Sequence, residues 1–149
     1  QSEAAMRYNG GTNAKTLYEM GVKASFTQWG ISTATGSPAA TLLAGAYAYP
    51  TAGTMDQNLK AIITQKWISL FPGKGYEAYF EHKRTKIPAV SAVAQSNPAY
   101  VPGQFAYSVN GTTGGIFPKR IVYPTSEAQT NSNFPGLVPI TTKLWYDAN

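Results

Sequence analysis

The chain has 149 residues, of which 13% are charged, with a net charge of +5 and no cysteine. The lack of cysteine excludes a disulfide framework and thiolate metal sites, and the low charged fraction, against roughly 25% in an average soluble domain, indicates a neutral, hydroxyl-rich surface suited to an extracellular setting. The basic residues are scattered apart from two short clusters, at 83–86 and 119–120, so the charge predicts no nucleic-acid partner, and no apolar run is long enough to span a bilayer.

Two helices are predicted near the start of the chain. Glu3–Tyr8 has the pattern of the end of a helix, stopped by Asn9–Gly11, which suggests that the chain is the C-terminal portion of a longer protein. Asn13 or Thr12 can cap the next helix, Ala14–Trp29. One side of that helix carries Tyr18, Val22, Phe26 and Trp29, and an adjacent side carries Leu17, Met20, Gly21 and Ala24. A helix that is apolar around so much of its circumference is expected to be enclosed by other helices.

A weak helix is predicted at Ala39–Tyr49, followed by a helical hairpin over Thr54–Pro88. Thr54 and Gln57 form a predicted capping box, and the Pro-Gly pair at 72–73 ends the first helix of the hairpin. Its apolar residues follow helical spacing: Met55, Leu59, Ile62, Ile63, Trp67 and Leu70. This stripe predicts a buried face, with Trp67 in the core.

The second helix of the hairpin has an apolar and a polar side by composition. Tyr76, Tyr79 and Phe80 predict its buried side. Glu77, Glu81, His82, Lys83 and Arg84 predict its exposed side. The fold class that follows is mainly α, with tetratricopeptide-like helix pairs in which further helices cover the aromatic seam.

After Pro88 the composition changes to proline, glycine, asparagine and threonine with isolated aromatic residues. This predicts a loop-rich cover over 89–149, attached to the helical part, 1–88, by aromatic anchors. Weak alternation predicts short strands at Gln104–Val109 and Arg120–Tyr123.

No catalytic residue, metal ligand or cofactor site is predicted. Glu77 and Glu81 lie one helical turn apart and could form an acid/base pair, but carboxylates on an exposed helix face more commonly pair with neighbouring bases. His82 is the single histidine, so it has no partner for a histidine metal cluster and is expected at the surface. Arg84 and Arg120 precede irregular backbone and are expected to hold carbonyl groups, or to clamp Glu127 or Glu77.

One loop offers the chemistry of sugar binding, which needs flat aromatic faces and amide groups. Its weak candidate ligand-binding residues are Tyr100, Gln104, Phe105, Tyr107 and Asn110. The alternative, favoured on general grounds, is that these aromatic side chains only anchor the loop.

Three segments resemble the SusD/RagB family of outer-membrane nutrient-binding lipoproteins of Bacteroidota. The first resemblance covers Ile62–Phe71, Gly75–Tyr79, Arg84–Thr85 and Ile87–Pro88, the second Pro118–Glu127 followed by Asn131 and Asn133, and the third Thr142–Asp147. The residues that carry the structural signature are Trp67, Glu77, Arg84, Pro88, Arg120, Tyr123, Pro124, Glu127 and Asn131. The chain departs from the family pattern at 82–83 and 86–87, which suggests a divergent member.

The resemblance implies a surface-exposed lipoprotein of the outer membrane. Such a protein is not an enzyme; it presents a glycan, or in some cases a peptide, to a SusC-type TonB-dependent transporter. The chain would be the C-terminal part of one SusD-like domain, with membrane contact only through a lipid anchor upstream of it. The alternative is a structural or peptide-binding scaffold subunit of an outer-membrane complex.

Overall fold

The computed structural model describes residues 1–106 and 110–147 and divides the chain into two compact units, Gln1–Pro88 and Ala89–Asn149. Each unit is described by itself. Within the described residues no helix is long and apolar enough to cross a membrane.

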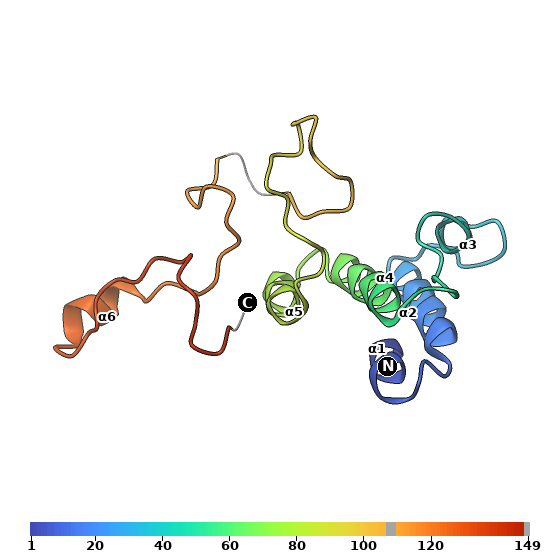
Figure 1. Cartoon of the computed structure of the whole chain (residues 1–149), viewed down its shortest axis with the longest axis horizontal. Helices are drawn as coiled ribbons and strands as arrows, with labels where there is room; N and C mark the ends of the chain where they lie inside the picture. The colour runs from blue at the N-terminus through green and yellow to red at the C-terminus, as the bar shows by residue number, and fades with distance from the viewer. Residues whose placement is uncertain (107–109, 148–149) are drawn as a thin grey trace. The chain divides into compact units, whose positions relative to one another are not determined.

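The first unit is a helical layer built around one central helix (Figure 1). Its helices are α1 Ser2–Tyr8, α2 Ala14–Gln28, α3 Pro38–Ala44, α4 Met55–Ser69 and α5 Gly75–Thr85. α4 contacts α1, α2 and α5, while α3 contacts α2. The helices predicted from the sequence are therefore confirmed, with bounds that differ by a few residues.

α4 begins where the capping box predicts. The Thr54 hydroxyl accepts a hydrogen bond from the Gln57 N–H at 3.3 Å, and the Gln57 side chain accepts one from the Thr54 N–H at 2.8 Å. Two of the N–H groups that a helix start leaves unpaired are thus satisfied. Of the predicted stripe, the middle residues Leu59, Ile62 and Ile63 are buried, whereas Met55 is 44% exposed and Trp67 only half-buried.

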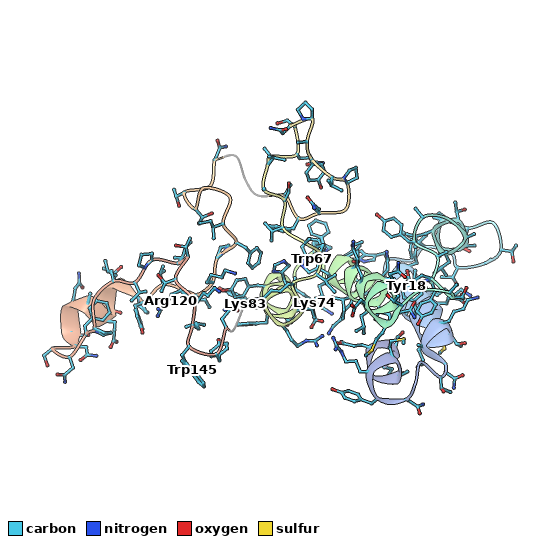
Figure 2. The ribbon with its side chains drawn as sticks, in the orientation of Figure 1. Tyr18, Trp67, Lys74, Lys83, Arg120 and Trp145 are labelled. Carbon is cyan, nitrogen blue, oxygen red and sulfur yellow. The ribbon has the colours of Figure 1, made fainter. Side chains whose placement is uncertain are left out.

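The core of this unit lies between α2 and α4, around Tyr18, Val22 and Ile62 (Figure 2 labels Tyr18). Partly buried apolar residues complete it: Met6, Phe26, Leu42, Leu43, Tyr49 and Ala61.

At the ends of α2, the prediction for Trp29 is wrong and that for Asn13 is right only in position. Trp29 is 55% exposed because the chain leaves the helix there and turns away at Gly30, whose φ is 68°. Asn13 is the N-cap residue, but its left-handed backbone, with φ of 62°, accompanies no side-chain capping bond. The Met20 side is also open, since Met20 is 60% exposed.

The predicted sides of α5 are wrong for four residues, whereas Glu77 and Arg84 are exposed and Tyr79 is half-buried, in line with the prediction. Tyr76 and Phe80 are 72% and 55% exposed, whereas Glu81 and His82 are buried. The reason is that polar side chains can be buried once they are paired: Glu81 lies between two cations, and the His82 ring is hydrogen-bonded to Pro88.

The second unit is mostly irregular, with one short helix, α6 Thr125–Thr130, among its described residues. A single parallel bridge joins Val90 to Phe105, and no strand forms over 1–106 and 110–147. The strand predicted at Arg120–Tyr123 does not form. The backbone N–H groups of Lys119 and Arg120 both donate to the carbonyl oxygen of Ile140, so they do not build the alternating bonds of a strand pair. The other predicted strand, Gln104–Val109, lies partly outside the described residues.

Candidate functional site

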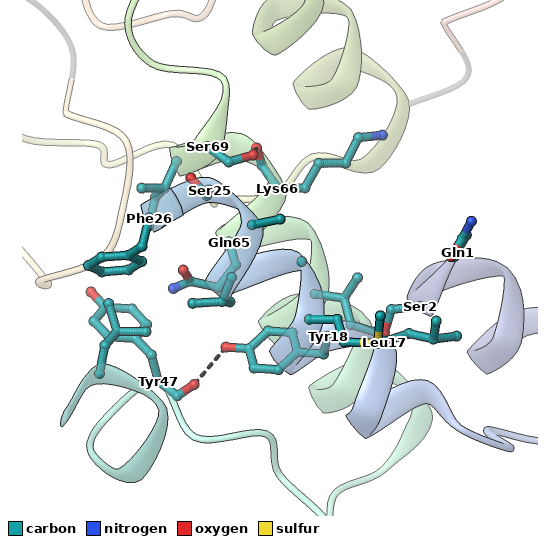
Figure 3. Close-up of a pocket in the computed structure, with 17 residues that line it drawn as sticks. Gln1, Ser2, Leu17, Tyr18, Ser25, Phe26, Tyr47, Gln65, Lys66 and Ser69 are labelled. Carbon is teal, nitrogen blue, oxygen red and sulfur yellow. Dashed lines mark hydrogen bonds between the residues drawn. The ribbon is translucent and has the colours of Figure 1, made fainter. Parts of the chain in front are cut away.

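An open groove of about 590 Å³ runs along α2 and the second half of α4 (Figure 3). We call it the α2–α4 groove. Its aromatic lining comes from Tyr18, Phe26 and Tyr47, and Gln1 and Ser2 at the start of α1 close one end. The volume falls within the range of small-molecule sites, and the lining is mainly apolar.

The groove lining contains the hydrogen-bonded hydroxyls of Ser2, Tyr18 and Ser69 and a buried amide donor. The Tyr18 hydroxyl donates to the Tyr47 carbonyl oxygen at 2.6 Å (Figure 3), and burial raises the pKa of Tyr18 to about 12, so this side chain stays neutral. The Gln65 amide nitrogen is buried and has no hydrogen-bond partner within the described residues. Figure 3 shows this amide directed toward the aromatic side chains of the groove.

Beside the groove, a chain of ion pairs links α1, α4 and α5. Arg84 holds Glu3 bidentately, at 2.8 and 2.7 Å, and also pairs with Glu81. Lys66 pairs with the second oxygen of Glu81 at 2.8 Å, and Arg7 pairs with Glu3 at 2.8 Å. The predicted carboxylate clamp by Arg84 is thus present, but its partners are Glu3 and Glu81 rather than the predicted Glu77 or Glu127.

The ion pairs set the protonation of both carboxylates. Hydrogen bonds from Arg84 and then Arg7, against partial burial, lower the pKa of Glu3 to about 2. Burial of Glu81 opposes its ionisation, but hydrogen bonds from Arg84 and Lys66 outweigh this and leave its pKa below the ordinary value. The same contacts raise the pKa of Arg84. Both carboxylates are therefore anions at neutral pH.

The geometry does not assemble the acid/base pair considered from the sequence. Glu77 is exposed, whereas Glu81 is buried and held ionised between two cations, so it has no proton to donate as a general acid. Among the residues that the structure describes, no group of three His, Cys, Asp or Glu side chains could hold a metal ion.

The surface position predicted for His82 is wrong. Its side chain is buried, and its Nε2 donates to the Pro88 carbonyl oxygen at 2.9 Å. Because Pro88 is also buried, this contact attaches the end of the first unit to α5. His82 and Pro88 therefore have a structural role here.

The predicted loop residues make contacts with one another and with the loop backbone. The Tyr100 hydroxyl donates to the Gln104 carbonyl oxygen at 2.7 Å, and the Phe105 ring packs edge-on to Phe117, with centroids 5.5 Å apart. Tyr107 lies outside the described residues, and Asn110 is exposed. These contacts favour the anchoring role for Tyr100 and Phe105, while the Gln104 side-chain amide makes no hydrogen bond within the described part of the chain.

The late signature residues gather around α6. Tyr123 lies between the Arg120 guanidinium, 5.2 Å from its ring centre, and the edge-on ring of Phe134. Pro124 is the N-cap residue of α6, and the Asn131 amide donates to Glu127. The Arg120 guanidinium lies over the Tyr123 ring, so the predicted clamp of Arg120 on Glu127 is wrong. The group that binds the Glu127 carboxylate is the Asn131 side-chain amide.

Sequence reasoning missed the groove, Gln65 and the roles of Glu3 and Lys66. The spacing of Glu3 and Arg7, one helical turn apart, indicates their own pair. No sequence signal connects Glu3 with Arg84 or Lys66 with Glu81, because these contacts arise only from helix packing.

A family model described as starch-binding associating with outer membrane matches residues 1–108, which is most of the chain. The chain belongs to this SusD-like family, whose members are outer-membrane binding proteins. The match covers α1 to α5 and the loop that follows them. No curated protein matches the chain.

Proposed function

We propose that this chain is the C-terminal part of a single SusD-like domain that acts as a non-catalytic, cell-surface nutrient-binding subunit with a glycan ligand. The observation that carries the proposal is the family match over residues 1–108. The contacts of Glu81 support the non-catalytic role, because Arg84 and Lys66 already engage both oxygens of this buried carboxylate.

The ligand contacts are proposed at the loop that contains Tyr100, Gln104, Phe105, Tyr107 and Asn110. The Gln104 amide is the best-supported member, since Tyr100 and Phe105 hold the loop and leave this amide for an external oxygen. In this arrangement the aromatic residues shape the loop, and the amide groups of Gln104 and Asn110 contact the ligand.

Calorimetric titration with starch-derived oligosaccharides, other glycans and peptides tests this site. Gln104→Ala is expected to weaken glycan binding about fivefold, which corresponds to roughly 1 kcal/mol for one neutral hydrogen bond. Gln95→Ala removes an exposed amide in the same loop region and is the matched control, with no expected change. If only peptides bind, the ligand is a peptide and not a glycan. If no ligand binds, the scaffold alternative is favoured.

The proposed partner is a SusC-type TonB-dependent transporter, and the proposed membrane attachment is a lipid anchor upstream of this chain. The family description places members at the outer membrane, which supports both. Extraction in mild detergent should co-purify a large β-barrel protein, and metabolic labelling with a fatty-acid analogue should mark the protein. Recovery of an unlabelled protein without the barrel would contradict this part of the proposal.

We also propose that α1–α2 and α4–α5 are tetratricopeptide-like pairs. Support comes from packing between helices that are neighbours in sequence, in both pairs. An experimental structure in which the two pairs superpose would establish the repeat, and pairs of unrelated crossing geometry would contradict it.

A further inference from the structure

The turn that joins α1 to α2 contains an exposed asparagine followed by a glycine, Asn9 and Gly10. Asn9 is the C-cap residue of α1, and its φ of −132° and ψ of 32° lie outside the regular helix. Gly10 has a left-handed φ of 56°, and a Cβ built on it would meet nothing within 4 Å. The space beside the peptide bond between these two residues is therefore open to water.

Two groups in this turn are left without a hydrogen bond. Neither the Gly10 N–H nor the Asn9 side-chain amide has a partner among the residues that the structure describes. The N–H groups on either side are held, because those of Asn9 and Gly11 both donate to the Ala5 carbonyl oxygen, at 3.1 and 3.0 Å. A paired N–H must first lose its bond before its nitrogen can react, whereas the Gly10 nitrogen has no such bond to lose.

A second asparagine at the end of the same turn has the opposite surroundings. Asn13 precedes Ala14, whose N–H donates to the Gly11 carbonyl oxygen at 3.0 Å and which is fully buried. Ala14 also carries a Cβ next to its nitrogen, which Gly10 lacks. The two asparagines therefore differ in how accessible the following backbone nitrogen is.

We propose that Asn9 is a site of spontaneous deamidation through a cyclic imide. The Gly10 nitrogen forms a bond to the Asn9 side-chain carbon Cγ, the bond from Cγ to Nδ2 breaks, and ammonia leaves with the proton of the Gly10 N–H. Water then opens the five-membered ring at one of its two carbonyl groups. One opening gives aspartate, and the other gives isoaspartate, in which the main chain runs through the former side chain. Water is the only co-reactant.

Both products change the end of α1. Each adds a negative charge near the last carbonyl groups of the helix, which form the negative end of its dipole. Isoaspartate also adds one carbon to the main chain between the two N–H groups that donate to Ala5, so both hydrogen bonds are disturbed. The modification therefore loosens the connection between α1 and α2.

Incubation of the folded protein in mildly alkaline buffer tests the proposal with a control in the same peptide. Trypsin, which cleaves after Arg7 and Lys15, releases residues 8–15 with both asparagines. Mass spectrometry should show Asn9 converted about tenfold faster than Asn13, because only Asn9 is followed by an unpaired glycine nitrogen. Fragmentation of the peptide should identify isoaspartate as well as aspartate.

Two variants and one measurement on the product extend this test. Asn9→Gln should abolish the fast conversion, because glutamine would have to close a larger ring. The matched Asn13→Gln should leave the yield from this peptide unchanged. The deamidated protein, separated by its added negative charge, should show faster hydrogen exchange in residues 2–8 than the unmodified protein.

Three results would overturn the proposal. Equal conversion of Asn9 and Asn13 would show that the following residue and its N–H do not control the reaction. Aspartate without isoaspartate would indicate direct hydrolysis of the amide instead of a cyclic imide. Conversion of Asn9 only in urea would show that the folded turn protects it. These measurements contain no glycan or peptide ligand, so they are independent of the proposed nutrient-binding role.

Discussion

At the scale of single residues, Arg84 joins α5 to α1 through its ion pairs. It is 47% exposed, yet it neutralises both Glu3 and the buried Glu81. An anion that is buried without its partners is strongly destabilising, whereas an exposed ion pair contributes little. Arg84 is thus an exposed cation paired with two carboxylates, of which Glu81 is more deeply buried than Glu3.

Arg84→Ala should lower the free energy of unfolding by about 1–3 kcal/mol, since Lys66 remains to pair with Glu81. Arg84→Lys should recover less than half of the loss, because an ammonium cannot hold Glu3 bidentately. Urea unfolding measures both variants. A loss for Arg84→Ala no larger than that for Arg7→Ala, whose pair is more peripheral, would contradict the central role.

Gly53 is a second residue that the structure singles out. A Cβ there would lie 2.9 Å from the Pro50 carbonyl oxygen and 3.0 Å from the Asn58 Oδ1. Gly53→Ala should therefore destabilise the protein by about 1–3 kcal/mol, as overpacking does. Gly21→Ala is the matched control in open space within α2, and it should stabilise by about 0.5–1 kcal/mol. Similar midpoints of thermal unfolding for the two variants would be inconsistent with this geometry.

At the scale of the helices, the start of α4 could be predicted from the sequence because its capping box is a local contact between residues three apart. Thr54→Ala should cost about 1 kcal/mol of stability. Thr51→Ala, an exposed threonine just before the helix, should change stability by less than about 0.5 kcal/mol. Chemical denaturation of both variants would show whether the cap contributes as expected.

α5 shows where sequence reasoning fails. Hydrophobicity placed Tyr76 and Phe80 inside and Glu81 and His82 outside, and the structure has the opposite arrangement. Burial of Glu81 is permitted by Arg84, three residues along α5, and by Lys66, 15 residues away on α4, and Arg84 is itself held by Glu3 of α1, 81 residues away. Periodicity describes one helix at a time, so it could not report partners on other helices, nor the groove that packing leaves between α2 and α4.

The ion pairs between α1, α4 and α5 predict a loss of stability in acid. Folding lowers the pKa of Glu3 from 4.5 to about 2, and it lowers that of Glu81 as well. A carboxylate with a lowered folded-state pKa stabilises the fold above its unfolded pKa, and this contribution disappears as the pH falls through the folded value.

The contribution of Glu3 to the free energy of unfolding should therefore be complete above pH about 4.5 and fall toward pH about 2. Once solvent screening is included, the loss from Glu3 should be on the order of 1–2 kcal/mol. Glu3→Gln should flatten that part of the profile, whereas Glu77→Gln, which changes an exposed carboxylate, should not. Unfolding midpoints measured across this range check the expectation, and identical acid profiles for the wild type and Glu3→Gln would refute it.

At the scale of the whole molecule, the two units differ in how they are held together. The core of Gln1–Pro88 is formed by its own residues, including Tyr18, Val22 and Ile62. The buried hydrogen bond between His82 and Pro88 holds the last residue of this unit against α5. Ala89–Asn149 relies on edge-on aromatic pairs and isolated backbone bonds, and its Trp145 is 94% exposed (Figure 2). By its contacts the first unit has a packed core, whereas the second consists of loops joined by local contacts.

This difference predicts unequal behaviour of two fragments. Residues 1–91 should keep the helical circular dichroism of the whole chain and unfold cooperatively, because every helix except α6 lies there with its core among the described residues. Residues 89–149 alone should show the spectrum of an unfolded chain, since a six-residue helix without a core is not stable in water. If fragment 1–91 lost its helicity, residues beyond it would have to supply part of the helical core. Cooperative folding of fragment 89–149 would instead make it a domain in its own right.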